Sequence, residues 1–313
     1  MTFAAPELHE QVEHGVRVWR DPAVGGRPIL GLGGPPVSSL LLRHLARPLA
    51  AGGFALALPE LFDPPPRRGR VLDLAERLAP LLPGGDGAVI AHGNAWPVAL
   101  ALAERGLVSR LILLDGPIDG LDPFSRALAG LARVSRPLAA RLLSPTLVLP
   151  ALASSAALRR LVVNPYLMDR DIVAMLGAPW SATAAHRAAV ADYLADIASF
   201  RANIDLPGTD VLWVWAGADV LQPKPTSPEK NVRGRSSTAV ALPGARHLAP
   251  EEVPWLIADA ILDRFGRTAP EARHDKNVAV SAPDPVEAPV PVEADHGTKP
   301  SKRGKRKAGT SAA

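Results

Sequence analysis

The sequence predicts an α/β protein with a mostly parallel sheet and helices on both of its faces. Short apolar runs alternate with segments of helical spacing, and turns rich in glycine, proline or aspartate separate them. The apolar runs are continuous rather than alternating, which is typical of strands buried on both sides of a parallel sheet. A chain of 313 residues, 47% of them apolar, has ample material for such a core.

Residues 1–117 contain most of the alternating segments. The first, Leu8–Arg20, has Glu13-His14-Gly15 in its middle and is predicted to form an antiparallel hairpin at the sheet edge. Strands are predicted at Arg27–Gly34, at Phe54–Pro59, in the run that begins at Gly87, and at Arg110–Leu114. Helices are predicted between them, at Ser38–Ala51, Val71–Leu82 and Pro97–Ala103.

The alternation stops in residues 118–205, which have a helical tendency. The breaks in this segment are predicted at its prolines, Pro123, Pro137, Pro145, Pro150, Pro165 and Pro179. Residues 206–268 return to the earlier pattern, with a strand at Val211–Ala216 and an amphipathic helix at Glu251–Phe265. The organisation therefore predicts one α/β core in two parts, with a helical segment inserted between them.

Residues 269–313 differ in composition from the rest of the chain. They are first rich in proline, alanine, valine and acidic residues, and then carry six basic residues between Lys299 and Lys307. This composition predicts a disordered tail. Its basic end is expected to touch anionic surfaces weakly, through charge alone, and a solvated tail is the favoured interpretation.

The segment Ala91-His92-Gly93-Asn94-Ala95 lies where a buried strand is expected to turn sharply into a helix. Such a turn holds the residue at its tip in backbone angles that most side chains tolerate poorly, and its neighbours must be small. Here the tip is Gly93, which adopts these angles without steric cost. Glycine offers no oxygen or sulfur atom for nucleophilic attack.

This segment resembles the Gly-His-Ser-x-Gly nucleophile elbow of the α/β-hydrolase superfamily, with Gly93 in place of the serine. Two later segments resemble the same family. Val211–Pro223 is similar to the family's late strand and acid loop, with Asp219 after the strand, and Leu242–His247 is similar to the loop that carries the histidine. The order of elbow, acid and base is the order of the family.

The resemblance implies a capped α/β-hydrolase fold. Its core would comprise residues 1–117 and 206–268, its helical cap residues 118–205, and the disordered tail residues 269–313. Gly177-Ala178-Pro179-Trp180, followed by Arg187, resembles a cap segment of haloalkane-dehalogenase-like and epoxide-hydrolase-like members. The dehalogenases have an aspartate at the elbow tip with a tryptophan after it, so their chemistry is not transferred to this chain.

The resemblance also implies roles for individual residues. His247 and Asp219 would be the catalytic dyad, and the oxyanion-hole N–H groups would come from Gly33 or Gly34 and from Asn94. A tight strand-to-helix turn explains the two glycines equally well.

Further candidates have simpler alternatives. His92, Trp96 and Trp180 are pocket candidates, although packing is the favoured interpretation of each. Asp115 follows the strand beside the elbow, where some relatives place their catalytic acid, and Asp115-Gly116-Pro117 is equally a plain turn.

Several classes of site and location are not expected. The chain has no cysteine, so it offers neither a thiolate nucleophile nor a disulfide. No histidine and carboxylate spacing suggests a metal site, and no cofactor is expected. The N-terminus lacks a basic segment before an apolar run, and no stretch approaches the ~18 apolar residues of a spanning helix, so a cytoplasmic protein is expected. The expected partner is a small-molecule substrate or ligand rather than a specific nucleic acid, and the oligomeric state is left open.

Three functional hypotheses follow. In the first, the chain is an enzyme that uses the His247/Asp219 dyad as a general base on a small, apolar substrate, without an acyl-enzyme. In the second, it is an inactive α/β-hydrolase homologue that binds a ligand or partner. In the third, it is a hydrolase with a displaced nucleophile, for which Ser38 and Ser39 are candidates, although both are also typical helix-capping residues.

Overall fold

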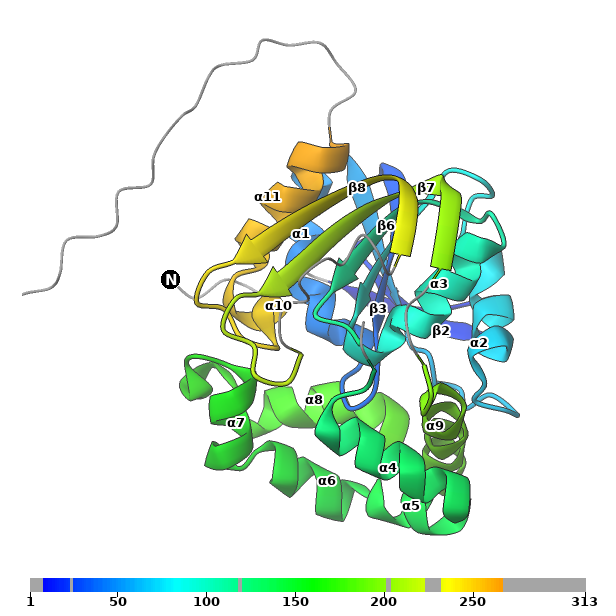
Figure 1. Ribbon diagram of the computed structural model, residues 1–313, viewed down its shortest axis with the longest axis vertical. Helices are drawn as coiled ribbons and strands as arrows, with labels where there is room; N and C mark the ends of the chain where they lie inside the picture. The colour runs from blue at the N-terminus through cyan, green and yellow to red at the C-terminus, as the bar shows by residue number, and fades with distance from the viewer. Residues whose placement is uncertain (1–7, 23–24, 118–119, 201–203, 223–231, 267–313) are drawn as a thin grey trace, which may run out of the picture. The chain divides into compact units, whose positions relative to one another are not determined.

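The computed structural model describes residues 8–22, 25–117, 120–200, 204–222 and 232–266, all within one compact unit, Met1–Ala269. The predicted tail, residues 269–313, lies outside the described residues. The unit is built on an eight-stranded sheet of order β1-β2-β4-β3-β5-β6-β7-β8 (Figure 1). The strands are β1 His9–Glu13, β2 Val16–Arg20, β3 Arg27–Gly33, β4 Phe54–Pro59, β5 Gly87–His92, β6 Val108–Leu114, β7 Ile204–Ala216 and β8 Val232–Leu242.

All pairings from β4 to β8 in this order are parallel, whereas the edge hairpin pairs antiparallel, both within itself and with β4. His14 and Gly15, between β1 and β2, both have positive φ, which matches the two-residue turn that suits the twist of a hairpin. The predicted edge hairpin and the predicted, mostly parallel sheet are therefore confirmed.

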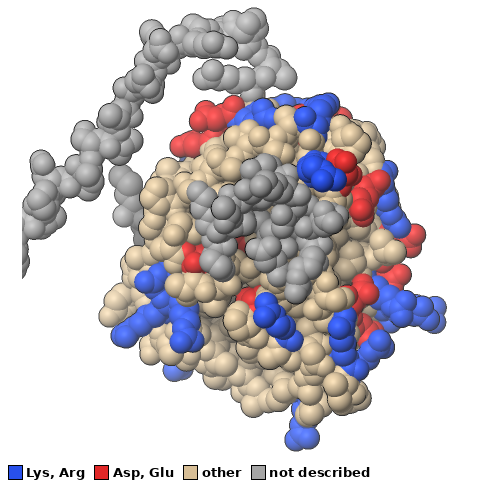
Figure 2. Space-filling model, viewed as in Figure 1, with Lys and Arg blue, Asp and Glu red and all other residues tan. Residues whose placement is uncertain are grey.

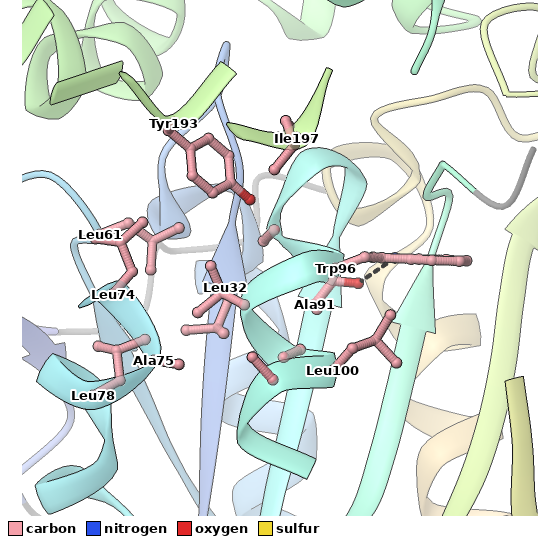
Figure 3. Close-up of a cluster of buried hydrophobic side chains, with 14 of the residues drawn as sticks. Leu32, Leu61, Leu74, Ala75, Leu78, Ala91, Trp96, Leu100, Tyr193 and Ile197 are labelled. Atoms are coloured by element: carbon pink, nitrogen blue, oxygen red, sulfur yellow. Dashed lines mark hydrogen bonds between the residues drawn. The ribbon is translucent and has the colours of Figure 1, made fainter. Parts of the chain in front are cut away.

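Helices cover both faces of the sheet, as the sequence predicts. One face is covered by α2 Val71–Leu78 and α3 Trp96–Glu104, and the other by η1 Ser39–Leu45, α1 Ala46–Ala51 and α11 Pro254–Phe265. Figure 3 shows the first of these cores, where side chains of α2 and α3 meet Leu32 of β3. The short helices are η2 Ala79–Leu81, η3 Gly93–Ala95, η4 Pro165–Leu167 and α10 Ala249–Glu252.

Among the described residues between β6 and β7 there are six α-helices, which we call the helical insertion. They are α4 Pro123–Val134, α5 Arg136–Leu142, α6 Pro145–Leu152, α7 Ser155–Leu161, α8 Arg170–Ser181 and α9 Ala184–Ile197. Figure 1 places the insertion beyond the carboxyl ends of the parallel strands.

On the face shown in Figure 2, the basic side chains lie in small, separate groups with acidic side chains among them.

The prolines of the insertion have two different roles. Pro123 and Pro145 open α4 and α6, where a missing N–H costs little. Pro150 and Pro179 instead lie inside α6 and α8, so the prediction of breaks there is wrong. The two helices pack against each other, and a Cβ atom on Gly177 of α8 would stand only 2.3 Å from the Leu149 side chain of α6. Tertiary packing of this kind maintains helices that propensity alone would interrupt.

Two further predictions need correction, and one strand of the structure has no counterpart among the predicted elements. The predicted helix Ser38–Ala51 divides into η1 and α1, and the predicted helix Glu251–Phe265 divides into α10 and α11 at Pro254, which opens α11. Strand β8 is not predicted, because its sequence between Arg233 and Thr238 is polar. As the last strand of the sheet it is largely exposed, and an edge strand needs no apolar run. No helix among the described residues is long and apolar enough to span a membrane.

Candidate active site

The turn after β5 forms the centre of the candidate site. Gly93 has φ +55°, a conformation that favours glycine, and η3 begins there and leads into α3. A Cβ atom at Gly93 would make only ordinary van der Waals contacts beyond its adjacent residues, with His247 Nε2 at 3.9 Å and the Asp115 carbonyl oxygen at 4.0 Å. Across the turn, a Cβ atom at Gly34 would stand 2.2 Å from Ala95 N. Gly34 therefore permits close contact between the β3 loop and the turn.

His247 and Asp219 meet beside this turn. Asp219 follows β7, His247 follows β8, and His247 Nδ1 lies 2.8 Å from Asp219 Oδ2. The Asp219 side chain is fully buried, and its Oδ1 accepts a hydrogen bond of 2.7 Å from Leu221 N–H. A carboxylate accepts only, so the proton of this pair lies on Nδ1 and the lone pair on Nε2. Nε2 is the atom nearest the tip at Gly93.

The electrostatic environment favours a charge-separated dyad. Burial alone would lower the pKa of His247, but the hydrogen bond and charge of Asp219 raise it above the usual value, and the charge of Asp122 adds to the effect. Burial alone would raise the pKa of Asp219, but the hydrogen bond and charge of His247 lower it. The arrangement can therefore accept a proton at Nε2 and stabilise the resulting imidazolium.

His92 supports the histidine loop from the end of β5. Its Nε2 lies 2.8 Å from the backbone oxygen of His247, and because a carbonyl only accepts, Nε2 carries the proton. Burial and the charge of His247 lower the pKa of His92 to about 3, so this ring stays neutral near pH 7. His92 lines the cavity described below and also positions the loop that carries His247.

Asp115 directly follows β6 and has a strained conformation, with φ +36°. Its Oδ1 accepts a hydrogen bond of 2.6 Å from Ala216 N–H, which joins the ends of β6 and β7. Burial raises the pKa of Asp115 to about 8, so the side chain is mostly protonated at neutral pH. Its hydrogen bond is that of a structural turn residue, and the carboxylate that contacts His247 Nδ1 belongs to Asp219.

A cavity of about 450 Å³ lies between the turn and the helical insertion. Gly93, Asn94 and His247 line it on the side of the sheet. The insertion supplies mostly apolar walls, Phe124, Leu128, Leu142, Leu147, Val148, Ala151, Leu152, Ala157 and Leu161. A largely apolar cavity with a few polar groups is the usual form of a small-molecule site. Within the described ranges, no group of three or more His, Cys, Asp or Glu side chains is placed to hold a metal ion.

Several other predicted site residues lie away from this cavity. Trp96 is buried in the core, where its Nε1 donates to the carbonyl oxygen of Ala91 (Figure 3) and to that of Leu114. Trp180 is buried within the insertion, and its Nε1 donates to Leu176 O at 3.1 Å. Both tryptophans serve packing, the interpretation that the sequence favours.

The first oxyanion candidate and the two serines are engaged elsewhere. Gly33 N–H donates to Ser39 Oγ at 3.1 Å, so it does not point into the cavity, whereas Gly34 and Asn94 both line it. Ser39 Oγ donates to Pro59 O at 2.6 Å, and Ser38 Oγ caps η1 by accepting from Leu40 N–H. Both serines are buried and neither lines the cavity.

Ser125 and Tyr193 of the insertion contact the turn, and sequence analysis does not single out either. Asn94 Nδ2 donates to Ser125 Oγ at 2.9 Å, and Tyr193 Oη donates to the Asn94 carbonyl oxygen. The local sequence signal near Ser125 is Asp122-Pro123, an aspartate cap followed by a first-turn proline. This signal predicts where α4 begins but not that α4 contacts the turn at Asn94.

Comparisons with known proteins identify the fold. No protein-family model and no curated protein matches the chain. Among solved structures, the epoxide hydrolase CorEH is 21% identical, with a TM-score of 0.65 over 82% of this chain and 98% of that one. An alpha/beta hydrolase fold protein from Burkholderia ambifaria is 23% identical, with a TM-score of 0.60 over 82% and 97%. A thermophilic esterase from Thermogutta terrifontis is 18% identical, with a TM-score of 0.59 over 82% and 97%. The protein therefore has the α/β-hydrolase fold.

Proposed function

We propose that this protein is an enzyme that uses His247 and Asp219 as a general base on a small, apolar molecule, without a covalent acyl-enzyme. One observation carries the proposal. His247 Nε2 faces the turn at a point 3.9 Å from where a Cβ atom of residue 93 would stand, and Gly93 has no side chain there. A proton acceptor is thus aimed at a position that a substrate atom can occupy.

The chemistry follows from the protonation of the dyad. With Nδ1–H donated to Asp219, the Nε2 lone pair is free to take a proton from a carbon acid or from a water molecule. A proton taken up by Nε2 creates an imidazolium, which the Asp219 carboxylate stabilises. The raised pKa of His247 makes it a stronger base than free histidine.

The glycine supports a mechanism without a covalent intermediate. Acyl transfer by the superfamily's serine route needs an oxygen at the elbow tip, and Gly93 has none. The serines nearest in sequence to the β3 loop, Ser38 and Ser39, are buried and already hydrogen-bonded outside the cavity, which argues against a displaced nucleophile among them. Removal of a side chain at the tip also gives the substrate more room beside Nε2.

5-Nitrobenzisoxazole is a suitable probe of this chemistry because its ring-opening elimination needs only a base. His247 Nε2 would take the proton from C3, the C–H electron pair would form the nitrile, and the N–O bond would break to release a coloured phenolate. We expect the wild-type protein to accelerate this reaction. His247→Ala should reduce kcat/KM by about 100-fold or more, since a positioned base contributes that much. His9→Ala, in the exposed strand β1, is the matched control and should react like the wild type.

The same experiment separates enzyme from binding protein. Binding of the probe is measured independently, by its ability to displace an apolar fluorescent dye from the cavity. A wild-type protein that binds the probe but turns it over no faster than His247→Ala would favour the alternative, an inactive homologue that binds ligands.

A further inference from the structure

Ser125 is a buried polar residue on an otherwise largely apolar wall of the cavity. It lies in the first turn of α4, its side chain lines the cavity, and the residue is only 2% exposed. Its backbone N–H donates to Asp122 Oδ1 at 3.0 Å, as part of the helix cap. The Ser125 hydroxyl takes no part in that cap.

The neighbouring amide determines which role the Ser125 hydroxyl plays. Asn94 Nδ2 lies 2.7 Å from the Pro35 carbonyl oxygen and 2.9 Å from Ser125 Oγ. A carbonyl oxygen only accepts, so the amide nitrogen must face Pro35, and the orientation of the Asn94 amide is settled. Both Nδ2 hydrogens are then in use, one to Pro35 and one to Ser125. Ser125 Oγ is the acceptor in this contact.

The hydroxyl hydrogen of Ser125 therefore has no acceptor among the described residues. Among the hydrogen bonds of the described residues, Ser125 Oγ takes part only in the one from Asn94. A buried donor without a partner is unfavourable. Ser125 lines the cavity and also a neighbouring void of about 10 Å³, and of these two spaces only the cavity of about 450 Å³ can hold a small molecule. The Ser125 O–H is therefore available to a bound molecule.

The donor is also held rigidly against the candidate site. Asn94 directly follows Gly93, and Tyr193 Oη of α9 donates to the Asn94 carbonyl oxygen. Figure 3 shows Tyr193 reaching down from the insertion toward the level of Ala91 and Trp96. Contacts to both the side chain and the backbone of Asn94 fix Ser125 relative to Gly93 and His247, and a fixed donor in an apolar cavity orients a ligand.

We propose that Ser125 Oγ donates a hydrogen bond to a carbonyl oxygen of the substrate, so that the site takes an apolar carbonyl compound. The carbonyl oxygen would face α4, and the reacting atom would face Gly93 and His247. This inference deepens the proposed function and rests on it for the identity of the site as a substrate site. The hydrogen bond itself requires no turnover, so it can be measured as binding.

Two fluorescent probes of the same shape test the proposal. One is 2-acetyl-6-(dimethylamino)naphthalene, a ketone whose emission moves to the red when its carbonyl accepts a hydrogen bond. The other is its 2-isopropyl analogue, which has no carbonyl. Ser125→Ala should weaken binding of the ketone by about 3- to 10-fold, the usual net worth of one hydrogen bond, and shift its emission to the blue. The analogue should bind Ser125→Ala as it binds the wild type.

Two further variants distinguish a hydrogen bond from a change in shape. Ser125→Thr keeps the hydroxyl and should restore the affinity and the emission of the ketone. Ser181→Ala is the matched control, because Ser181 is a buried serine of α8 whose Oγ donates to Gly177 O at 2.7 Å, outside the cavity lining. It should change neither probe's affinity.

The proposal is wrong if Ser125→Ala weakens both probes equally, if it leaves the ketone's affinity and emission unchanged, or if the wild type binds neither probe. Its failure is distinct from failure of the proposed function. If the wild type does not catalyse the benzisoxazole elimination, the proposed catalytic role of His247 fails. If both the wild type and His247→Ala still bind the ketone more tightly than its analogue, the Ser125 contact is retained.

Discussion

Introducing a serine at Gly93 is the sharpest test of how His247 and Asp219 are aligned with the turn. In Gly93→Ser, the new Cβ would have no contact shorter than 3.9 Å beyond the adjacent residues, so the Cβ itself causes no clash. The cost is backbone strain, because φ at Gly93 is +55° and an L-residue pays roughly 1–2 kcal/mol in this region. For a unit of this size, Met1–Ala269, that corresponds to a fall in Tm of about 2–4 °C. Gly93→Ala carries the same strain without the hydroxyl.

A rotamer of the introduced serine that points toward His247 would bring its oxygen closer to Nε2 than the 3.9 Å of the Cβ. In that rotamer the oxygen can reach the roughly 2.6–3.2 Å at which a nucleophile contacts its base. We expect a fluorophosphonate to label Gly93→Ser at the introduced hydroxyl, detected by intact mass and peptide mapping, and expect no label on the wild type or on Gly93→Ala. A Gly93→Ser protein with the same Tm as Gly93→Ala but no label would refute the alignment of the dyad with the tip. Labelling of the wild type at any serine would instead revive a displaced nucleophile.

Two further predictions concern pH. Elimination of 5-nitrobenzisoxazole requires neutral His247, so its rate should rise with pH through a midpoint above 6.5. Asp219→Asn should lower that midpoint, because it removes the charge that raises the pKa of His247. An unchanged midpoint would contradict this prediction. Burial and the charge of Asp63 raise the pKa of Glu60 from 4.5 to about 8. As pH rises between these two values, Glu60 ionises in the unfolded chain but stays protonated in the folded one, so the free energy of unfolding falls. Urea titrations between pH 5 and pH 8 should show that the wild type loses about 3 kcal/mol more than Glu60→Gln, and parallel curves would show that Glu60 does not titrate in this way.

Local sequence patterns determined the order of the elements and the position of the turn. An apolar run from Gly87, a glycine at the tip and a proline at the start of the next helix predict strand, turn and helix without any distant partner. The prediction of Asp219 and His247 as a pair rested on family resemblance and chain order. The sequence could therefore indicate that the two residues form a pair, but not the distance of 2.8 Å between His247 Nδ1 and Asp219 Oδ2.

Only the tertiary structure decided which polar groups remain free for chemistry. Gly33 and Gly34 are adjacent and identical in sequence, yet Gly33 N–H is used by Ser39 while Gly34 lines the cavity. Ser125 is 31 positions from Asn94, and no local pattern indicates that their side chains meet. The packing of distant segments decides whether a donor finds an acceptor within the protein or remains available to a ligand. Periodicity and turn chemistry report what the backbone does locally, whereas the cavity and the unused hydroxyl of Ser125 exist only once the insertion has packed against the sheet.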